Sequence, residues 1–392
     1  MIEKWKSIFI KIYTGQAISI VTSGIVQFVL ILYITKTTGS AFYLAMASMA
    51  GFLPQGILSI FVGAFIDRNN RKRIIVYADL FIALATLLLV IFISLNLLSI
   101  NLILIFLVVR SIGSAFHAPA LQATIPLIVP VENLLKYNGY IMAIQSLSLV
   151  ISPIIGALLF ELLSLNIILS LDIIGACFAS LMVIVVKIPE VVKNDSIPNN
   201  YWFDLKKGFE IINTNKKIKL LFIYIFFFTL LFMPINALFP LMVTSYFNLG
   251  SIYLGIVETA FALGMLISSI MIGKLVFFNN LDRNIVLACL LMSFSLILSG
   301  ILSLSMYLIF ILLCIIMGLC GPLFNSSFST IIAQNVAEEY LGRIYSSVFT
   351  ITLLATPIGL LFTGMFADNI GVNIWFLLTG ILMLLLVVFQ YY

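Results

Sequence analysis

Three of the ionisable side chains that lie within long apolar stretches of this sequence are candidates for proton coupling. Arg110 and His117 are seven residues apart in the stretch 101–125, and that spacing places two side chains on the same face of a helix. Glu258 is an acid in the stretch 251–275. Histidine changes charge near neutral pH, and a charge in apolar surroundings is costly unless it is paired or faces water. We therefore predict that Arg110, Glu258 and His117 couple the movement of a proton, with Arg110 and Glu258 as a candidate charge pair. The alternatives are a static Arg110–Glu258 pair and a structural hydrogen bond from His117.

The stretches that contain these residues belong to a series of twelve apolar segments, each long enough to cross a membrane. Hydrophobic residues make up 63% of the 392 residues and charged residues only 9%, which is too little charge to cover a soluble protein. In lipid, a helix of about 20 apolar residues spans the bilayer and satisfies its own backbone. We predict an all-α membrane protein with twelve transmembrane helices. The expected spans are 11–35, 42–66, 74–96, 101–125, 138–160, 165–187, 218–243, 251–275, 284–305, 307–332, 343–367 and 372–391.

The basic residues indicate how these spans are oriented. Lys and Arg gather in connections on the cytoplasmic side of a membrane protein. Of the 20 basic residues, 18 precede the first span or lie in even-numbered connections, and only Lys36 and Arg110 do not. We therefore expect a multi-pass protein of the cytoplasmic membrane with both termini in the cytoplasm. The net charge of +5 reflects this topology and does not indicate nucleic-acid binding.

The longest connection divides the chain into two sets of six spans. We expect one bundle over residues 1–187, a cytoplasmic linker over 188–217 and a second bundle over 218–392. Within the linker, residues 202–212 place their apolar side chains on one face, which predicts a helix at the membrane surface or a short helix in a solvated linker. The two halves also contain a similar short sequence, because the Ser-Pro-Ile-Ile-Gly of 152–156 resembles the Thr-Pro-Ile-Gly of 356–359. Two related six-helix bundles with a site between them are a known transporter architecture.

The connection after the second span carries the strongest local motif. It begins at Gly63, continues through the acid–base pair Asp67 and Arg68, and ends in a basic run that includes Arg71 and Lys72. The motif resembles the signature of the major facilitator superfamily. The resemblance implies a cytoplasmic gate formed by Gly63, Asp67, Arg68, Arg71, Lys72 and Asp79. A clamp that only holds the loop at the anionic membrane surface is the alternative.

Individual positions in this motif have expected roles. Gly63 would let two helices approach closely, and Asp79 would pair with the basic residues of the gate. Asn70 stands where the family has glycine, and asparagine tolerates the left-handed backbone conformation.

The fourth and fifth spans resemble further patterns of the superfamily. Arg110 matches the fourth-span Arg-x-x-x-Gly pattern, which the family associates with proton transfer, although the glycine comes one place early. In the fifth span, small residues around Pro153 and Gly156 follow the spacing that is typical of antiporters. The resemblance implies a hinge at Pro153 and Gly156 and, by the internal echo, at Pro357 and Gly359. Ordinary close packing of small residues is the alternative.

Uncharged polar side chains at helical spacing predict which faces line a substrate cavity. Amides and hydroxyls beside aromatic residues suit a bulky, amphipathic substrate, and hydrogen bonding between helices is the alternative. The expected cavity residues are Gln16, Ser19, Ser23, Gln27, Gln145, Ser148, Asn236 and Asn325.

Over its whole length the chain resembles the macrolide-efflux branch of this superfamily, through Phe52-Leu53-Pro54-Gln55, Asp79-Leu80 and the run from Arg110 to Pro119. The resemblance implies export of hydrophobic drugs such as macrolides in exchange for protons, by a monomer without cofactors. Export of a siderophore or another secreted metabolite is the alternative. A membrane enzyme finds no support, since hydrolase, metalloprotease and phosphate-loop motifs are missing. The four cysteines lack the paired spacing of a metal site, so no metal is expected.

Overall fold

The structure is a computed structural model that describes residues 2–130, 133–188, 216–274, 280–336 and 338–388. Within these ranges the regular structure is entirely helical, which confirms the predicted fold class. Residues 202–212, where the linker helix was predicted, lie outside the described residues. The helices are α1 (Ile2–Thr38), α2 (Ala41–Arg68), α3 (Arg71–Ser94), α4 (Ile100–Ile128), α5 (Leu134–Leu162), α6 (Leu165–Val185), α8 (Lys216–Leu241), the π-helical turn η2 (Met242–Tyr246), α9 (Ser251–Lys274), α10 (Leu281–Ile301), α11 (Tyr307–Asn335), α12 (Glu338–Ile370) and α13 (Val372–Val388).

Most of these helices have the length and composition of membrane spans. Over the described residues, 11 helices are long and apolar enough to cross a bilayer, and Val372–Val387 forms a shorter apolar helix. Large apolar side chains such as Leu308 (75% exposed) and Tyr77 (68% exposed) cover the outside of the helices. Exposed apolar surface of this kind is stable against lipid and not against water. The chain is therefore a multi-pass membrane protein.

The helices form two compact units. The first contains residues 1–34 and 47–198, and the second contains residues 35–46 and 199–392. The segment 35–46 belongs with the second unit, where the Asp368 carboxylate accepts hydrogen bonds from the Ser40 hydroxyl (2.6 Å) and the backbone N–H of Ala41 (2.5 Å). The carboxylate thereby caps the start of α2, a position that favours negative charge.

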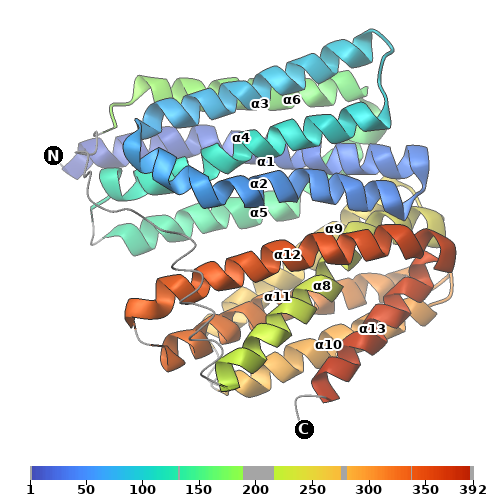
Figure 1. Cartoon of the computed structure of the whole chain (residues 1–392). Coiled ribbons are helices and arrows are strands. Elements are labelled where there is room, and N and C mark those ends of the chain that lie inside the picture. Colours follow the sequence, from blue (N-terminus) through green and yellow to red (C-terminus); the bar gives the residue numbers. More distant parts are fainter. Residues whose placement is uncertain (1, 131–132, 189–215, 275–279, 337, 389–392) are drawn as a thin grey trace. The chain divides into compact units, whose positions relative to one another are not determined.

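The two units repeat the same pattern of helix packing. In the first unit α3 packs on α4 and α6, and in the second unit α10 packs on α11 and α13 (Figure 1). A further packed pair of helices occurs in both units, and in each unit the two helices meet at a glycine. A Cβ at Gly156 of α5 would lie 2.8 Å from Phe28 of α1, and a Cβ at Gly359 of α12 would lie 2.8 Å from Pro234 of α8. Both glycines permit close helix contact, as small residues do in membrane proteins. The weak echo in the sequence thus corresponds to repeated packing within each unit.

Aromatic side chains fill the core of the second unit. Phe228 and Phe324 stack with their ring centroids 4.1 Å apart, and Phe239 packs against Phe261 at 5.6 Å. Phe239 and Phe324 are fully buried. Both rings therefore belong to the packed core of this unit.

Candidate functional site

A cavity of about 210 Å³ lies inside the first unit, and its lining includes the buried charged residues Asp79 and Arg110. Its walls come from α1, α3, α4 and α6. The residues that line it are Gln16, Ser19, Ile20, Ser23, Asp79, Ile82, Arg110, Ser114, His117, Ala118 and Ala176. Two charged clusters meet at this cavity.

The first cluster is an ion pair between Arg110 of α4 and Asp172 of α6. Arg110 Nη1 lies 2.7 Å from Asp172 Oδ2, and Arg110 Nη2 donates to the Ser23 carbonyl at 3.1 Å. The Ser23 hydroxyl donates to Asp172 Oδ1 at 2.7 Å, and the Thr86 hydroxyl lies 3.2 Å from Asp172 Oδ2. Asp172 is fully buried and Arg110 is 8% exposed. A buried pair this well satisfied by hydrogen bonds acts as a fixed charge pair.

The second cluster joins Asp79 of α3, His117 of α4 and Gln16 of α1. His117 Nε2 lies 3.1 Å from Asp79 Oδ1, an ion-pair distance at which the two groups are not aligned as a hydrogen bond. Gln16 Nε2 donates to Asp79 Oδ2 over a long 3.4 Å. Gln16 Oε1 is buried and has no hydrogen-bond partner among the described residues. This cluster is therefore less completely satisfied than the Arg110–Asp172 pair.

Helical spacing and small residues bring these side chains together. Arg110, Ser114 and His117 are successive neighbours on one face of α4, and all three line the cavity. On the opposite side of the cavity, Gly175 of α6 approaches α1 so closely that an added Cβ would press on Thr22. Close approach of α1 and α6 is what places Ser23 within reach of Asp172.

The two clusters differ in how protons affect their charge. Arginine stays protonated, so the Arg110–Asp172 pair is neutral overall as long as the aspartate is ionised. The Asp79–His117 pair is neutral when histidine carries its proton and has one negative charge when histidine loses it. The cavity thus contains one pair whose net charge is fixed and one pair whose net charge depends on protonation.

Two of the predicted charged residues have partners within the first unit. The counter-ion of Arg110 there is Asp172. Asp79 contacts His117 and Gln16, whereas Arg71 and Lys72 of the basic run donate to backbone carbonyls. Asp172 was missed by the sequence analysis, although an acid within the apolar stretch 165–187 is the same signal that singled out Glu258.

The basic residues after α2 tie helix ends together. Arg71 Nη1 donates to the Ala123 carbonyl of α4 at 2.6 Å, and Lys72 Nζ donates to the Ile184 and Val186 carbonyls at the end of α6, at 2.8 and 2.7 Å. Cations are favourable at helix C-termini, where carbonyls are unpaired. Beyond the predicted contact with the membrane surface, Arg71 and Lys72 therefore hold the start of α3 against α4 and α6.

Other residues of this loop differ from their expected roles. Asn70 has extended backbone dihedrals (φ −69°, ψ 109°) and caps α3 by accepting from the backbone N–H of Arg73, so it does not need the left-handed conformation. A Cβ at Gly63 would meet nothing within 4 Å among the described residues, so no close helix contact is seen at Gly63 among them. The side chains of Asp67 and Arg68 lie outside the description.

The remaining predicted site residues divide between the cavity and helix packing. Gln16, Ser19 and Ser23 line the cavity of the first unit. Ser148 donates to the Ile20 carbonyl at 3.2 Å, so it joins α5 to α1. The others lie as follows: Gln27 and Asn236 are half-buried, Gln145 and Asn325 are exposed, and Pro153 and Pro357 lie inside α5 and α12.

Glu258 lies in α9 of the second unit, where it is half-buried. Within the second unit no cation among the described residues lies at ion-pair distance from it. Three residues further along the helix, α9 packs on α11 at Phe261, whose carbonyl faces Gly318. The acid is thus placed on a tightly packed helix with no fixed counter-ion among the described residues of its own unit.

Comparisons with known proteins agree with this architecture. The family model described as transmembrane secretion effector matches residues 5–392. Macrolide efflux protein A of Streptococcus pyogenes is 40% identical over 386 residues, which cover 97% of this chain and 95% of that protein. A protein of the same name from Enterococcus faecalis is 38% identical over 326 residues, 82% of this chain and 100% of that protein.

Solved structures of transporters share the fold. A nucleoside transporter matches with a TM-score of 0.74 at 13% identity and covers 97% of this chain and 98% of its own. A bacterial homologue of the iron transporter ferroportin, in an inward-facing state, matches with a TM-score of 0.73 at 15% identity over the same shares of the two chains. These proteins are transporters and not enzymes. The chain therefore belongs to the transmembrane secretion effector family of the major facilitator superfamily.

Proposed function

We propose that this protein exports hydrophobic, macrolide-like antibiotics across the cytoplasmic membrane in exchange for protons. The main support for a macrolide as the exported compound is the 40% identity, over 97% of the chain, with a protein named for macrolide efflux. The protein would act as a monomer with both termini in the cytoplasm, and the proton gradient would supply the energy. The distribution of Lys and Arg supports that orientation.

The cavity of the first unit supports the coupling to protons. His117 lies 3.1 Å from Asp79, so loss of one proton there leaves a negative charge next to the buried Arg110–Asp172 pair. In this proposal Arg110 provides a fixed positive charge at the cavity, and His117 with Asp79 takes up and releases the proton. Glu258 provides a second protonation site in the other unit, since no described cation of that unit lies beside it.

Alternating access would follow from bending at Pro153 with Gly156 and at Pro357 with Gly359. A proline removes one backbone hydrogen bond and bends a helix. The neighbouring glycines let the same helices pack against α1 and α8. The loop with Gly63, Asp67, Arg68, Arg71 and Lys72 would act as the cytoplasmic gate in one of the two states.

The cargo is tested by drug accumulation in cells. Expression of the protein should lower the steady-state level of a radiolabelled macrolide, and a protonophore should restore that level. Unchanged accumulation would refute the macrolide assignment and direct the search to a siderophore or another secreted metabolite.

The coupling is tested in inverted membrane vesicles with an imposed pH gradient. We expect Glu258→Gln and His117→Gln to lose gradient-driven drug uptake while they remain folded. Asp282→Asn, which removes an exposed acid in the first turn of α10, is the matched control and should keep it. Gradient-driven uptake at the wild-type rate in Glu258→Gln would remove that residue from the mechanism, and the same result in His117→Gln would remove the Asp79–His117 pair.

A further inference from the structure

A second cavity of about 530 Å³ lies in the first unit, away from the cavity that holds Arg110. It is a groove between the end of α2, the first turns of α3 and the middle of α4. The residues that line it are Phe65, Asn69, Asn70, Arg73, Ile74, Tyr77, Ala78, Phe81, Ile112, Gly113 and Phe116. Its volume falls in the range of about 300–1,000 Å³ that is usual for ligand pockets.

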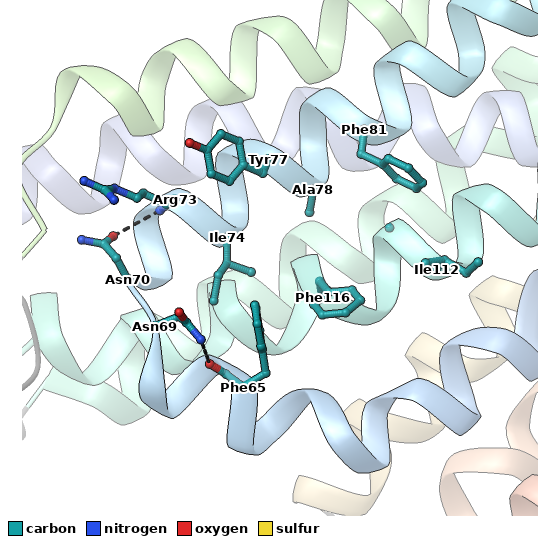
Figure 2. A pocket seen from close by; sticks show the side chains of 11 residues that line it. Phe65, Asn69, Asn70, Arg73, Ile74, Tyr77, Ala78, Phe81, Ile112 and Phe116 are labelled. Atoms are coloured by element: carbon teal, nitrogen blue, oxygen red, sulfur yellow. Dashed lines mark hydrogen bonds between the residues drawn. The ribbon is translucent and has the colours of Figure 1, made fainter. Parts of the chain in front are cut away.

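The groove is polar at one end and apolar along the rest. Figure 2 shows the Arg73 guanidinium, the Tyr77 hydroxyl and the Asn70 amide at one end, and Phe81 and Ile112 at the other. Phe65 and Phe116 close the middle from α2 and α4, with their ring centroids 5.7 Å apart in an edge-to-face arrangement. Such a lining fits a ligand with one polar head and a long apolar body.

Arg73 carries the charge at the polar end. Among the described cations of this loop, Arg71 and Lys72 donate to backbone carbonyls of α4 and α6. No described carboxylate lies at ion-pair distance from Arg73, whose side chain is exposed. Its backbone N–H is satisfied by Asn70 Oδ1 at 3.2 Å, which leaves the guanidinium available to an anion. Guanidinium groups favour phosphate because they can bind it through two parallel hydrogen bonds.

The position of the groove in the chain places it at the membrane boundary. Arg73 lies in the first turn of a membrane-spanning helix, whereas Phe81 lies two turns further into the span. The polar end is therefore at the depth of lipid head groups, and the apolar end is at the depth of acyl chains. Basic pockets between membrane helices bind anionic head groups in this way.

We propose that this groove binds an anionic phospholipid, with the head-group phosphate on Arg73 and one acyl chain along Ile74, Phe81 and Phe116. A free phosphate ion would gain nothing from the apolar walls, and a zwitterionic lipid would be held by the walls with little benefit from the Arg73 charge. The bound lipid would bridge the end of α2 to α3 and α4. This inference does not depend on the cargo or on proton coupling.

The test places a fluorescent reporter in the groove. Phe116→Trp adds one tryptophan to Trp5, Trp202 and Trp375, and the quenching of the parent protein is subtracted. The purified variant is reconstituted in phosphatidylcholine vesicles with increasing fractions of brominated phosphatidylglycerol or brominated phosphatidylcholine. We expect phosphatidylglycerol to quench the introduced indole with an apparent affinity about fivefold higher, the effect of one cation at an anionic lipid surface.

Two charge variants decide what causes the preference. Arg73→Gln should reduce it to that of phosphatidylcholine. Arg283→Gln is the matched control, because Arg283 holds the same place in α10, where its backbone N–H is accepted by Asn280 Oδ1 at 3.1 Å, but it does not line the groove. This control should keep the full preference. Equal quenching by the two lipids, or an unchanged preference in Arg73→Gln, would overturn the proposal.

Inorganic phosphate distinguishes a lipid site from a site for a free anion. If the acyl chain provides much of the binding, millimolar phosphate should leave the quenching by phosphatidylglycerol unchanged. Loss of the quenching on addition of phosphate would show that the site recognises the anion alone, and the lipid assignment would fail.

Discussion

The ion pair between Arg110 and Asp172 predicts that removal of one charge is far more damaging than removal of one hydrogen bond. Asp172→Asn keeps the size of the side chain and an oxygen acceptor for Arg110, but leaves the arginine charge without a counter-ion. Loss of one partner of a buried pair costs about 3–5 kcal/mol. Because Arg110 also lines a cavity, water can solvate part of its charge, and we expect the lower end of this range, about 3 kcal/mol. That energy corresponds to about a hundredfold change in the folding equilibrium.

The assay is equilibrium unfolding of the purified protein in mixed micelles with increasing SDS. Ser23→Ala removes the 2.7 Å hydrogen bond to Asp172 Oδ1 without a change in charge, so it should cost only about 1.5 kcal/mol, the lower end for a hydrogen bond to a charged group. The double variant Arg110→Met/Asp172→Leu removes both charges and should be more stable than Asp172→Asn, since apolar replacement of a buried pair is often neutral. Together with the single variants Arg110→Met and Asp172→Leu, a double-mutant cycle then gives the coupling between the two charges.

Two results would refute this reasoning. Asp172→Asn could unfold at the same SDS fraction as the wild type, which would mean that water or another acid neutralises Arg110 at no cost. Alternatively, Ser23→Ala could cost as much as Asp172→Asn, which would mean that hydrogen bonds and not charge dominate the cluster.

Three further predictions follow from single contacts. Gly264→Ala should lower the thermal stability strongly, because the added Cβ would collide with the Ile315 backbone carbonyl of α11, whereas Gly321→Ala, with nothing within 4 Å, should be neutral or slightly stabilising; equal melting temperatures would contradict this. Lys72→Met should cost about 0.3–1 kcal/mol in the same SDS titration through the loss of its bonds to the end of α6. Lys219→Met, at an exposed position, should cost nothing measurable, and a larger loss there would argue against helix-end pairing. Finally, His117→Gln should weaken the pH dependence of drug export, because glutamine cannot exchange a proton at this position; an unchanged pH profile in vesicles would exclude this residue as the proton carrier.

The fold could be predicted from the sequence because lipid imposes a simple rule on each span. Every helix must be long, apolar and internally hydrogen-bonded, so the twelve α-helices that the structure describes begin and end within a few residues of the apolar segments, apart from extensions such as the start of α1 at Ile2. The extension of α1 before its apolar segment was not predicted, because an amphipathic lead-in continues a helix without a hydrophobic signal.

The site could be predicted only where one helix determines it. The spacing of Arg110 and His117 along α4 places both at one cavity, since a single helix has a known period. The partners come from other helices, Asp172 from α6 and Asp79 from α3, and no local pattern indicates which helices are neighbours. The misplaced role of Asn70 has a local cause: its side chain oxygen accepts from the N–H of Arg73, and a cap of this kind competes with a left-handed turn.

The two units have the same pattern of helix packing but bury different kinds of side chain. The charged residues that are buried among the described residues are Asp79, Arg110 and Asp172, all in the first unit. The largest fully buried aromatic side chains are Phe239, Phe310, Phe324, Phe328 and Phe376, all in the second unit. Burial of aromatic rings does not depend on pH, whereas a buried cluster of acids and a histidine changes its net charge with each proton. In the proposed function, a proton bound at the Asp79–His117 pair would change the net charge inside the first unit. The packing of α1, α3, α4 and α6 around Asp79 is then where proton binding would be converted into movement.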